Sequence, residues 1–223
     1  MLDQGVLDRP VVLAQPRLRG LLHAVAFPLA LVAGMALITF GPTLTARLAA
    51  AVYVLTSALL FGVSAAFHLG RWSPRVSLLL RRSDHANIYL VTAGTYMPFV
   101  LLSMEGKVRI LVLCLVWGGA TAGIAVRVLW TGVPRWTCVG LYLALGWTAV
   151  LFLPYLLYGA GLTATLLVVA GGVLYSAGGI VYGLQRPDPS PGWFGFHEIF
   201  HAFTIAAYAL HYAAVSLVVY AAP

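Results

Sequence analysis

The last apolar run of the chain begins with Gly195-Phe196-His197-Glu198-Ile199-Phe200-His201. On a helix, residues four apart lie on the same face, so His197 and His201 can bind a single metal ion. At about 100° per residue, three further polar residues stay within about 40° of His197. These are Thr204, Tyr208 and His211. The last predicted helix therefore carries a polar stripe through an apolar segment.

The composition is typical of a membrane protein. Of the 223 residues, 61% are hydrophobic and 9% are charged, whereas a soluble domain has about 25% charged residues. The formal net charge is +7, but the basic residues occupy short gaps between apolar runs and form no stripe interleaved with aromatic residues. This pattern argues against nucleic acid as a partner and favours membrane lipids.

Seven apolar runs each come near the roughly 20 residues that a helix needs to cross a bilayer. They cover approximately residues 19–39, 47–68, 85–104, 108–128, 137–158, 162–183 and 196–219. We therefore predict an all-α, polytopic integral protein of the inner or plasma membrane, with seven transmembrane helices. Residues 1–18 form a cytoplasmic N-terminal arm in this prediction, and residues 19–223 form the seven-helix transmembrane domain.

Most basic residues fall on one side of the membrane in this topology. That side holds Arg9, Arg17, Arg19, Arg71, Arg75, Arg81, Arg82, Arg127, Arg135 and Arg186. The other side holds Arg47, Lys107 and Arg109. The positive-inside rule then places the N-terminus in the cytoplasm and the C-terminus outside.

Ionisable groups from three predicted helices share one membrane depth. His68 ends the 47–68 helix, which runs inward, and Asp84 begins the 85–104 helix, which runs outward. His197 and His201 begin the 196–219 helix, which also runs outward, so all four groups lie at cytoplasmic ends. Ser64 lies one turn before His68 on the same face. An Asp at mid-bilayer costs about 3 kcal/mol, so we expect these side chains to face inward and pair.

The chemistry of this set fits zinc. Three neutral imidazoles, from His68, His197 and His201, can bind Zn²⁺ and leave a water molecule in the fourth position. Zinc would lower the pKa of that water to about 7 and supply a nucleophile at neutral pH. Asp84 could accept the water's proton or hold the water in place, and Ser64 could donate to a substrate oxygen or orient a ligand. We predict Asp84 and Ser64 as catalytic residues and Zn²⁺ as the cofactor.

Several of these residues also have a structural interpretation. His68 can be a hydrogen-bonded residue at the membrane interface, and Asp84 can cap the N-terminus of the 85–104 helix beside Arg81 and Arg82. A structural role is also preferred for four further residues of the apolar runs, His23, His85, Tyr208 and His211.

Three blocks of sequence are specific in combination. They are Ser64-Ala65-Ala66-Phe67-His68; Arg81-Arg82-Ser83-Asp84-His85 with Ile88-Tyr89-Leu90 and Ala93-Gly94-Thr95-Tyr96-Met97-Pro98-Phe99; and Gly195-Phe196-His197-Glu198-Ile199-Phe200-His201 with His211-Tyr212. Over nearly its whole length the chain resembles the haemolysin III branch of the progestin-and-adiponectin-receptor family. The resemblance implies seven helices with a cytoplasmic N-terminus. It also implies a zinc ion held by the three histidines, with Asp84 at the zinc-bound water, Ser64 nearby, and hydrolysis of a lipid amide such as ceramide. Many bacterial members carry an acidic stretch before the histidine of the first helix, and this chain has Pro16-Arg17-Leu18-Arg19-Gly20-Leu21-Leu22-His23 instead.

We predict a membrane-embedded, zinc-dependent, ceramidase-like hydrolase of a lipid amide or ester that enters from the bilayer. One alternative is a non-enzymatic, haemolysin-like or membrane-homeostasis protein with a structural zinc. Asp84 would then be the fourth zinc ligand and would complete the coordination sphere. Another is an intramembrane metalloprotease, because His197-Glu198-x-x-His201 matches the H-E-x-x-H pattern with Glu198 as general base. The sequence predicts no particular oligomeric state.

Overall fold

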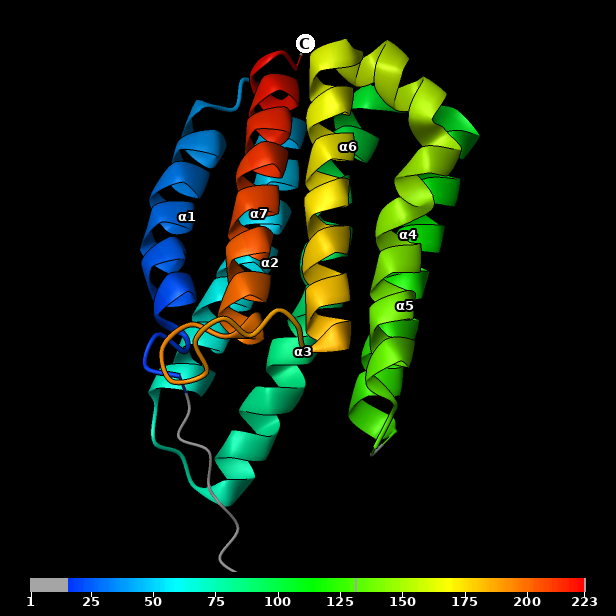
Figure 1. Cartoon of the computed structure of the whole chain (residues 1–223). Coiled ribbons are helices and arrows are strands. Elements are labelled where there is room, and N and C mark those ends of the chain that lie inside the picture. Colours follow the sequence, from blue (N-terminus) through cyan, green and yellow to red (C-terminus); the bar gives the residue numbers. More distant parts are fainter. Residues whose placement is uncertain (1–15, 131, 223) are drawn as a thin grey trace, which may run out of the picture.

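The computed structural model describes residues 16–130 and 132–222, so most of the predicted N-terminal arm lies outside the described residues. The described chain is helical: α1 (Leu21–Phe40), α2 (Leu44–Leu69), α3 (Pro74–Ser103), α4 (Gly106–Leu129), α5 (Arg135–Trp147), the 3-10 helix η2 (Thr148–Phe152), α6 (Leu153–Leu184) and α7 (Phe196–Tyr220). Figure 1 shows these helices as one bundle, with the C-terminus at one end and the α6–α7 loop at the other. We call the end with the α6–α7 loop the basic end, because the arginine-bearing α2–α3 and α4–α5 connections also lie there.

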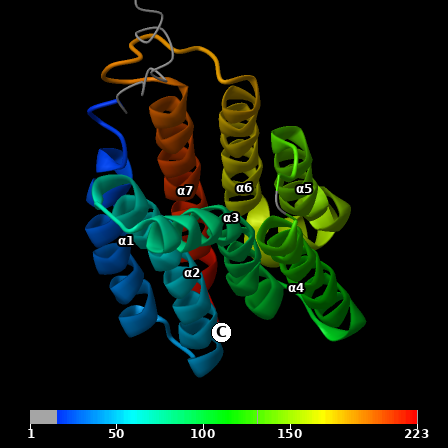
Figure 2. The same ribbon diagram turned by 90° about the horizontal axis from the view of Figure 1, so that it is seen from below.

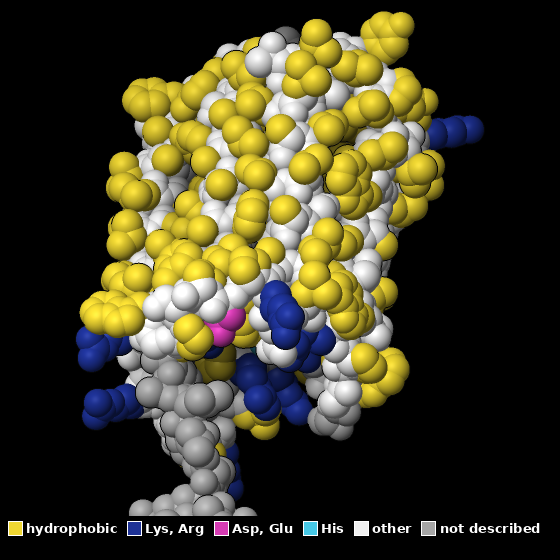
Figure 3. Space-filling view, viewed as in Figure 1, with side chains coloured by type: hydrophobic (Ala, Val, Ile, Leu, Met, Phe, Trp, Pro, Cys, Tyr) yellow, Lys and Arg dark blue, Asp and Glu magenta, His cyan; other side chains and the backbone are white. Residues whose placement is uncertain are grey.

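Within the described residues, six helical segments are long and apolar enough to span a membrane. They are Leu21–Phe40, Leu44–Leu69, Pro74–Ser103, Gly106–Leu129, Arg135–Leu184 and Phe196–Tyr220. Apolar side chains cover the outside of the bundle between its two ends, while Lys and Arg gather mainly near the basic end (Figure 3). The protein is therefore a multi-pass integral membrane protein.

The fifth of these segments, Arg135–Leu184, has 50 residues and changes direction. It consists of α5, η2 and α6, and Gly161 interrupts α6 with φ 81° and ψ 167°. A residue with a side chain rarely adopts a positive φ, so glycine is suited to this bend. The chain turns over at the C-terminal end of the bundle and α6 then runs back beside α5 (Figure 1). Pro154, predicted inside the 137–158 helix, lies in the first turn of α6.

Helix α3 begins at Pro74, whereas the apolar run predicted a start at residue 85. Ser73 is extended, and Pro74 occupies the first helical turn, where its missing N–H removes no hydrogen bond. The basic residues after Pro74 are therefore helical, although they lie outside the apolar pattern. Asp84 lies in the interior of α3, so its interpretation as an N-cap is wrong.

The helices that carry the predicted site pack around α7. Helix α7 contacts α1, α2, α3 and α6, and the view along the bundle shows it between α1 and α6 (Figure 2). Helices α2 and α3 also pack on each other. This packing brings the basic ends of α2, α3 and α7 together.

Small residues of α6 face aromatic side chains of α5, as expected for close helix packing in a membrane. A Cβ at Gly179 or Gly183 would overlap the side chain of Tyr142 or Trp136. The indole N–H of Trp147 donates to Ser176 Oγ at 2.9 Å. These contacts hold α5 against α6 and form one wall of the cavity described below.

Candidate metal centre

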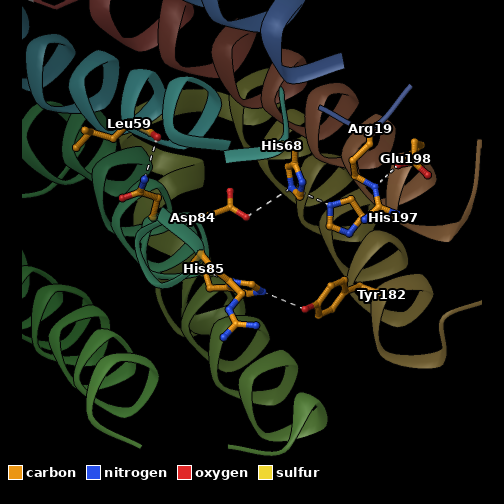
Figure 4. A network of polar contacts seen from close by, with 10 residues as sticks. Arg19, Leu59, His68, Asp84, His85, Tyr182, His197 and Glu198 are labelled. Carbon is orange, nitrogen blue, oxygen red and sulfur yellow. Dashed lines mark hydrogen bonds and ion pairs between the residues drawn. The ribbon is translucent and has the colours of Figure 1, made fainter. Parts of the chain in front are cut away.

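His68, His197 and His201 meet at the basic end, where α2 and α7 approach each other. Figure 4 shows His68 and His197 pointing toward one another. One ring nitrogen of each histidine lies within 4.8 Å of the others, and the Nε2 atoms of His68 and His197 are 3.2 Å apart. His68 lies in the last turn of α2, and the two α7 histidines lie one turn apart on the same face. The structure brings together the three histidines that the sequence indicated; their role as zinc ligands stays a prediction.

The donor set of this histidine triad fits a zinc ion. Imidazole is a good ligand for zinc, and tetrahedral coordination with bonds of about 2.0–2.1 Å places two ligand nitrogens about 3.3–3.4 Å apart. The 3.2 Å between His68 and His197 is close to that value. The largest separation in the triad is within 4.8 Å, so modest side-chain rotation would complete the set.

Asp84 approaches the triad from α3. Its Oδ2 lies 3.8 Å from Nε2 of His68 (Figure 4), which is longer than a hydrogen bond between these atoms. A separation of this size is a close electrostatic contact without a direct hydrogen bond. The carboxylate is therefore placed beside the position where a ligand on the triad would lie.

Ser64 lies one turn before His68 on α2 and is buried. Its Oγ makes no well-formed hydrogen bond among the described residues, but it lies close to the Asp84 carboxylate, to which a small rotation would let it donate. Ser64 lines the same cavity as Asp84, His197 and His201. A buried hydroxyl without a partner beside a cavity can bind water or a ligand oxygen.

Glu198, the acidic residue of the H-E-x-x-H pattern, is 1% exposed and both of its carboxylate oxygens are hydrogen-bonded. Oε1 accepts from Nε of Arg19 at 2.6 Å, and Oε2 accepts from the backbone N–H of Gly195 at 2.8 Å. The second bond is one half of a capping box at the start of α7. Sequence reasoning missed the Arg19 pair because its partners are 179 residues apart. The spacing of Gly195 and Glu198 was a local signal for the cap.

His23 of α1 stacks on His201. The ring centroids are 3.8 Å apart, with 6° between the ring planes, and His23 is 3% exposed. Gly20, with φ +81°, lies against His68, where an added Cβ would meet the His68 side chain. The start of α1 therefore contacts two of the three histidines. The sequence indicated a structural role for His23 but not this neighbour.

Comparison with known proteins supports the family that the sequence resembles. Residues 12–212 match the model of a family described as Haemolysin-III related. The chain belongs to this family. It is similar to Hemolysin-3 of Bacillus cereus, with 30% identity over 171 residues, 75% of this chain and 74% of that protein. It is also similar to the Hemolysin-3 homolog of Bacillus subtilis (strain 168), with 33% identity over 136 residues, 59% of each chain.

An apolar cavity of this haemolysin-III related protein runs from the triad towards the C-terminal end. Its wall includes Asp84 and His201 at one end and Leu156 at the other. Trp147 and Val150 also line it and are 38% and 49% exposed on the outside of the bundle. The cavity is therefore bounded by side chains that also face the lipid.

The remaining polar side chains make packing contacts. Nδ1–H of His85 donates to the carbonyl of Arg81 at 2.7 Å, so in the neutral ring Nε2 accepts from the hydroxyl of Tyr182 at 3.1 Å (Figure 4). Deeper in the bundle, Nε2 of His211 donates to the carbonyl of Val168 at 3.0 Å. His85 and His211 line the cavity but lie outside the triad.

Proposed function

We propose that this haemolysin-III related protein is a membrane-embedded, zinc-dependent, ceramidase-like hydrolase of a lipid amide or ester. The observation that carries the proposal is the meeting of three imidazoles with one carboxylate and one free hydroxyl at the end of an apolar cavity. Three imidazoles leave a zinc ion open for chemistry. The cavity offers an apolar path for the rest of a lipid, whose acyl chain would lie along it.

His68, His197 and His201 would hold the zinc ion, which when bound acidifies a water molecule and polarises a carbonyl group. Asp84 accepts a proton from the attacking water, and Ser64 donates a hydrogen bond to the carbonyl oxygen of the substrate. The water oxygen bonds to the acyl carbon, the C–N bond breaks, and Asp84 passes its proton to the leaving nitrogen. The products are a fatty acid and an amine.

Substitution of Asp84 by Asn tests this mechanism. Purified wild-type protein should contain about one zinc per chain, and Asp84→Asn should retain it while the release of fatty acid from an N-acyl amide falls about 100-fold or more, because the proton acceptor is lost. Zinc is measured by elemental analysis and fatty acid by mass spectrometry. His197→Ala should lose the zinc.

Glu105→Gln is the matched control, since Glu105 is an exposed carboxylate at the far end of the bundle. It should change neither zinc content nor turnover. Full turnover by Asp84→Asn, or by metal-free protein, would contradict the proposal. A lipid analysis of membranes with and without the wild type and Asp84→Ala would then identify the substrate.

The names of the two Bacillus relatives favour a second candidate, a non-enzymatic haemolysin-like protein. Zinc would then fasten α2, α3 and α7 together, with Asp84 moving the short distance needed to become the fourth ligand. A structure of the zinc-loaded protein separates the candidates. An Asp84 oxygen at about 2.0–2.2 Å from zinc would close the site and favour the structural role, whereas a longer separation would favour hydrolysis.

Glu198→Gln separates the lipid hydrolase from the intramembrane metalloprotease. Glutamine keeps an acceptor for the N–H of Gly195, so the cap at the start of α7 can persist. We expect hydrolysis of the lipid amide to be largely retained, because both Glu198 oxygens are already hydrogen-bonded. If the protein were a metalloprotease, Glu198→Gln would remove the general base and lower the rate of peptide hydrolysis about 100- to 10,000-fold. The rate is measured on purified variant whose zinc content matches that of the wild type.

For the topology we propose seven membrane crossings. The 50 residues of Arg135–Leu184 suffice for two crossings of about 20 residues each, and the bend at Gly161 divides them. The positive-inside rule then places the basic end, with residues 1–18, in the cytoplasm and the C-terminus outside.

A further inference from the structure

Two arginines of the basic end lie beside the cavity. Figure 3 shows Lys and Arg side chains gathered at this end of the bundle. Among residues 16–130 and 132–222, the ion pairs are Arg19 with Glu198 and His68 with Asp84. Arg127 and Arg135 therefore form no direct ion pair within the described part of the chain, although Arg127 lies near enough to Asp84 for their charges to interact.

Arg127 of α4 points into the bundle. Gly123, one turn earlier on the same face, packs against the ring of Tyr89 in α3, which an added Cβ would overlap. His85 lies one turn before Tyr89, and α3 and α4 run antiparallel (Figure 1), so Arg127 lies at the level of His85. Nε of Arg127 is buried without a hydrogen-bond partner among the described residues. An arginine placed only to face the membrane surface would keep this atom in water.

Arg135, the first residue of α5, faces the same place from the other side. Its guanidinium carbon lies 5.7 Å from the centroid of the Tyr182 ring. Tyr182 and Tyr142 both line the cavity, next to His85. The hydroxyl of Tyr142 is buried and has no partner among the described residues. The hydroxyl of Tyr142 thus lies in the cavity wall, and the two guanidinium groups lie behind that wall, next to residues that line it.

These groups favour an anion. A guanidinium group only donates hydrogen bonds, and its planar fork matches phosphate and carboxylate oxygens. Nε of half-buried Arg127 has no partner among the described residues, so an anion that accepts from it would gain a charge-assisted hydrogen bond. This part of the cavity wall is close to the triad, because the ring of Tyr182 lies 6.3 Å from that of His197, centroid to centroid. An anion bound there can therefore belong to the molecule whose acyl chain occupies the cavity.

We propose that the rim formed by Arg127, Arg135 and Tyr142 binds the anionic headgroup of the lipid that this protein hydrolyses. The inference rests on the proposed function, and it specifies the substrate class as a lipid amide with a negatively charged group close to the scissile bond. Arg127 and Tyr142 donate to the headgroup oxygens, and Arg135 supplies charge at the entrance. These residues set headgroup specificity, while the triad, Asp84 and Ser64 act on the amide.

The test uses three N-lauroyl amides that differ only in their terminal group. N-lauroylethanolamine phosphate is anionic, N-lauroylethanolamine is neutral, and N-lauroylethylenediamine is cationic. Zinc-loaded, full-length protein in a neutral detergent should bind the phosphate at least about tenfold more tightly than the neutral amide, as expected for one charge-assisted hydrogen bond. Binding is followed by isothermal titration calorimetry, and hydrolysis is measured in parallel.

Arg127→Gln and Arg135→Gln should each remove most of this preference for the phosphate over the neutral amide. Arg75→Gln is the matched control, because Arg75 is exposed in the first turn of α3; it should keep the full preference. Arg127→Lys keeps the positive charge but lacks the planar guanidinium, so it should keep part of the preference for the phosphate. Thermal unfolding verifies that each variant is folded, and Arg135, exposed at the rim, can be replaced even if Arg127→Gln does not fold.

The outcomes separate this inference from the proposed function. Preferential binding of the phosphate without hydrolysis of any amide would support the headgroup site and contradict the hydrolase. Hydrolysis without a headgroup preference would contradict the headgroup site alone. A preference for the phosphate that survives both Arg127→Gln and Arg135→Gln would also contradict the headgroup site. A preference that falls equally in Arg75→Gln would contradict it as well.

Discussion

At the scale of single residues, the metal centre depends on side chains from the two ends of the sequence. His23 stacks on His201, and Arg19 pairs with Glu198. The same N-terminal segment is tied to the α6–α7 loop, where the N–H of Arg17 donates to the carbonyl of Gly192 at 3.1 Å. The residues before α1 and its first turn therefore help to hold the start of α7, which carries two histidines of the triad.

Substitutions of His23 test whether its stacked ring or its ring nitrogens help to hold His201 in place. Both nitrogens are buried without a partner among the described residues, so His23→Phe should keep the stack on His201 and the zinc affinity. His23→Ala removes the stack and should lower the affinity about tenfold, because His201 can then rotate. Competition with a chelator measures the affinity. Equal loss in both variants would show that a nitrogen of His23 binds the metal or its water.

The sequence pattern indicated the four ionisable residues of the site, but it did not indicate the residues that pack against them. His68, Asp84 and the α7 histidines lie at helix ends whose depth follows from alternating helix direction. The stack of His23 and the Arg19 pair depend on which faces of distant helices meet. A single sequence carries no local periodicity that reports this.

At the scale of helices, close packing of α2 on α3 sets the distance between His68 and Asp84. Gly94 of α3 lies against Thr56 of α2, and a Cβ at Gly94 would overlap the Thr56 side chain. The hydroxyl of Thr56 donates back to the carbonyls of Val52 and Tyr53, both at 3.0 Å, so it is not a flexible surface group. The interface has no room for a larger residue at position 94.

Gly94→Leu should therefore destabilise the protein by about 1–3 kcal/mol, the usual cost of overpacking. Thermal unfolding in detergent measures the effect as a lower midpoint. Gly118→Leu in α4 is the matched control, because no heavy atom lies within 4 Å of a Cβ at Gly118, and its midpoint should stay unchanged. Equal midpoints for the two variants would mean that α2 and α3 do not pack as described.

The helix boundaries show where the apolar pattern is informative. It located the cores of the helices, since lipid requires apolar side chains there. It placed the start of α3 too late, because the first turns of α3 extend beyond the apolar run and carry arginines. Ser73-Pro74 was the local signal for the earlier start. The gap between the predicted runs 137–158 and 162–183 contains Gly161, whose positive φ marks the bend in the structure.

At the scale of the whole molecule, the number of crossings decides the side on which each end lies. If Arg135–Leu184 crosses the membrane twice, the total number of crossings is odd, and the start of α1 and the end of α7 lie on opposite sides of the membrane. If it crosses once, they lie on the same side. The bend at Gly161 and the return of α6 beside α5 favour two crossings.

Reporter fusions in a bacterial host test the topology directly. Alkaline phosphatase is active only outside the cytoplasm, and green fluorescent protein fluoresces when fused on the cytoplasmic side. With seven crossings and the basic end inside, a fusion after Ala222 should give active phosphatase and no fluorescence. A fusion after Trp130, in the α4–α5 connection, should give the reverse and serves as the control. Fluorescence from the fusion after Ala222, with the control unchanged, would mean an even number of crossings. The triad and the arginine rim lie at the same end of the bundle as Trp130, so the control also reports the side on which they face water.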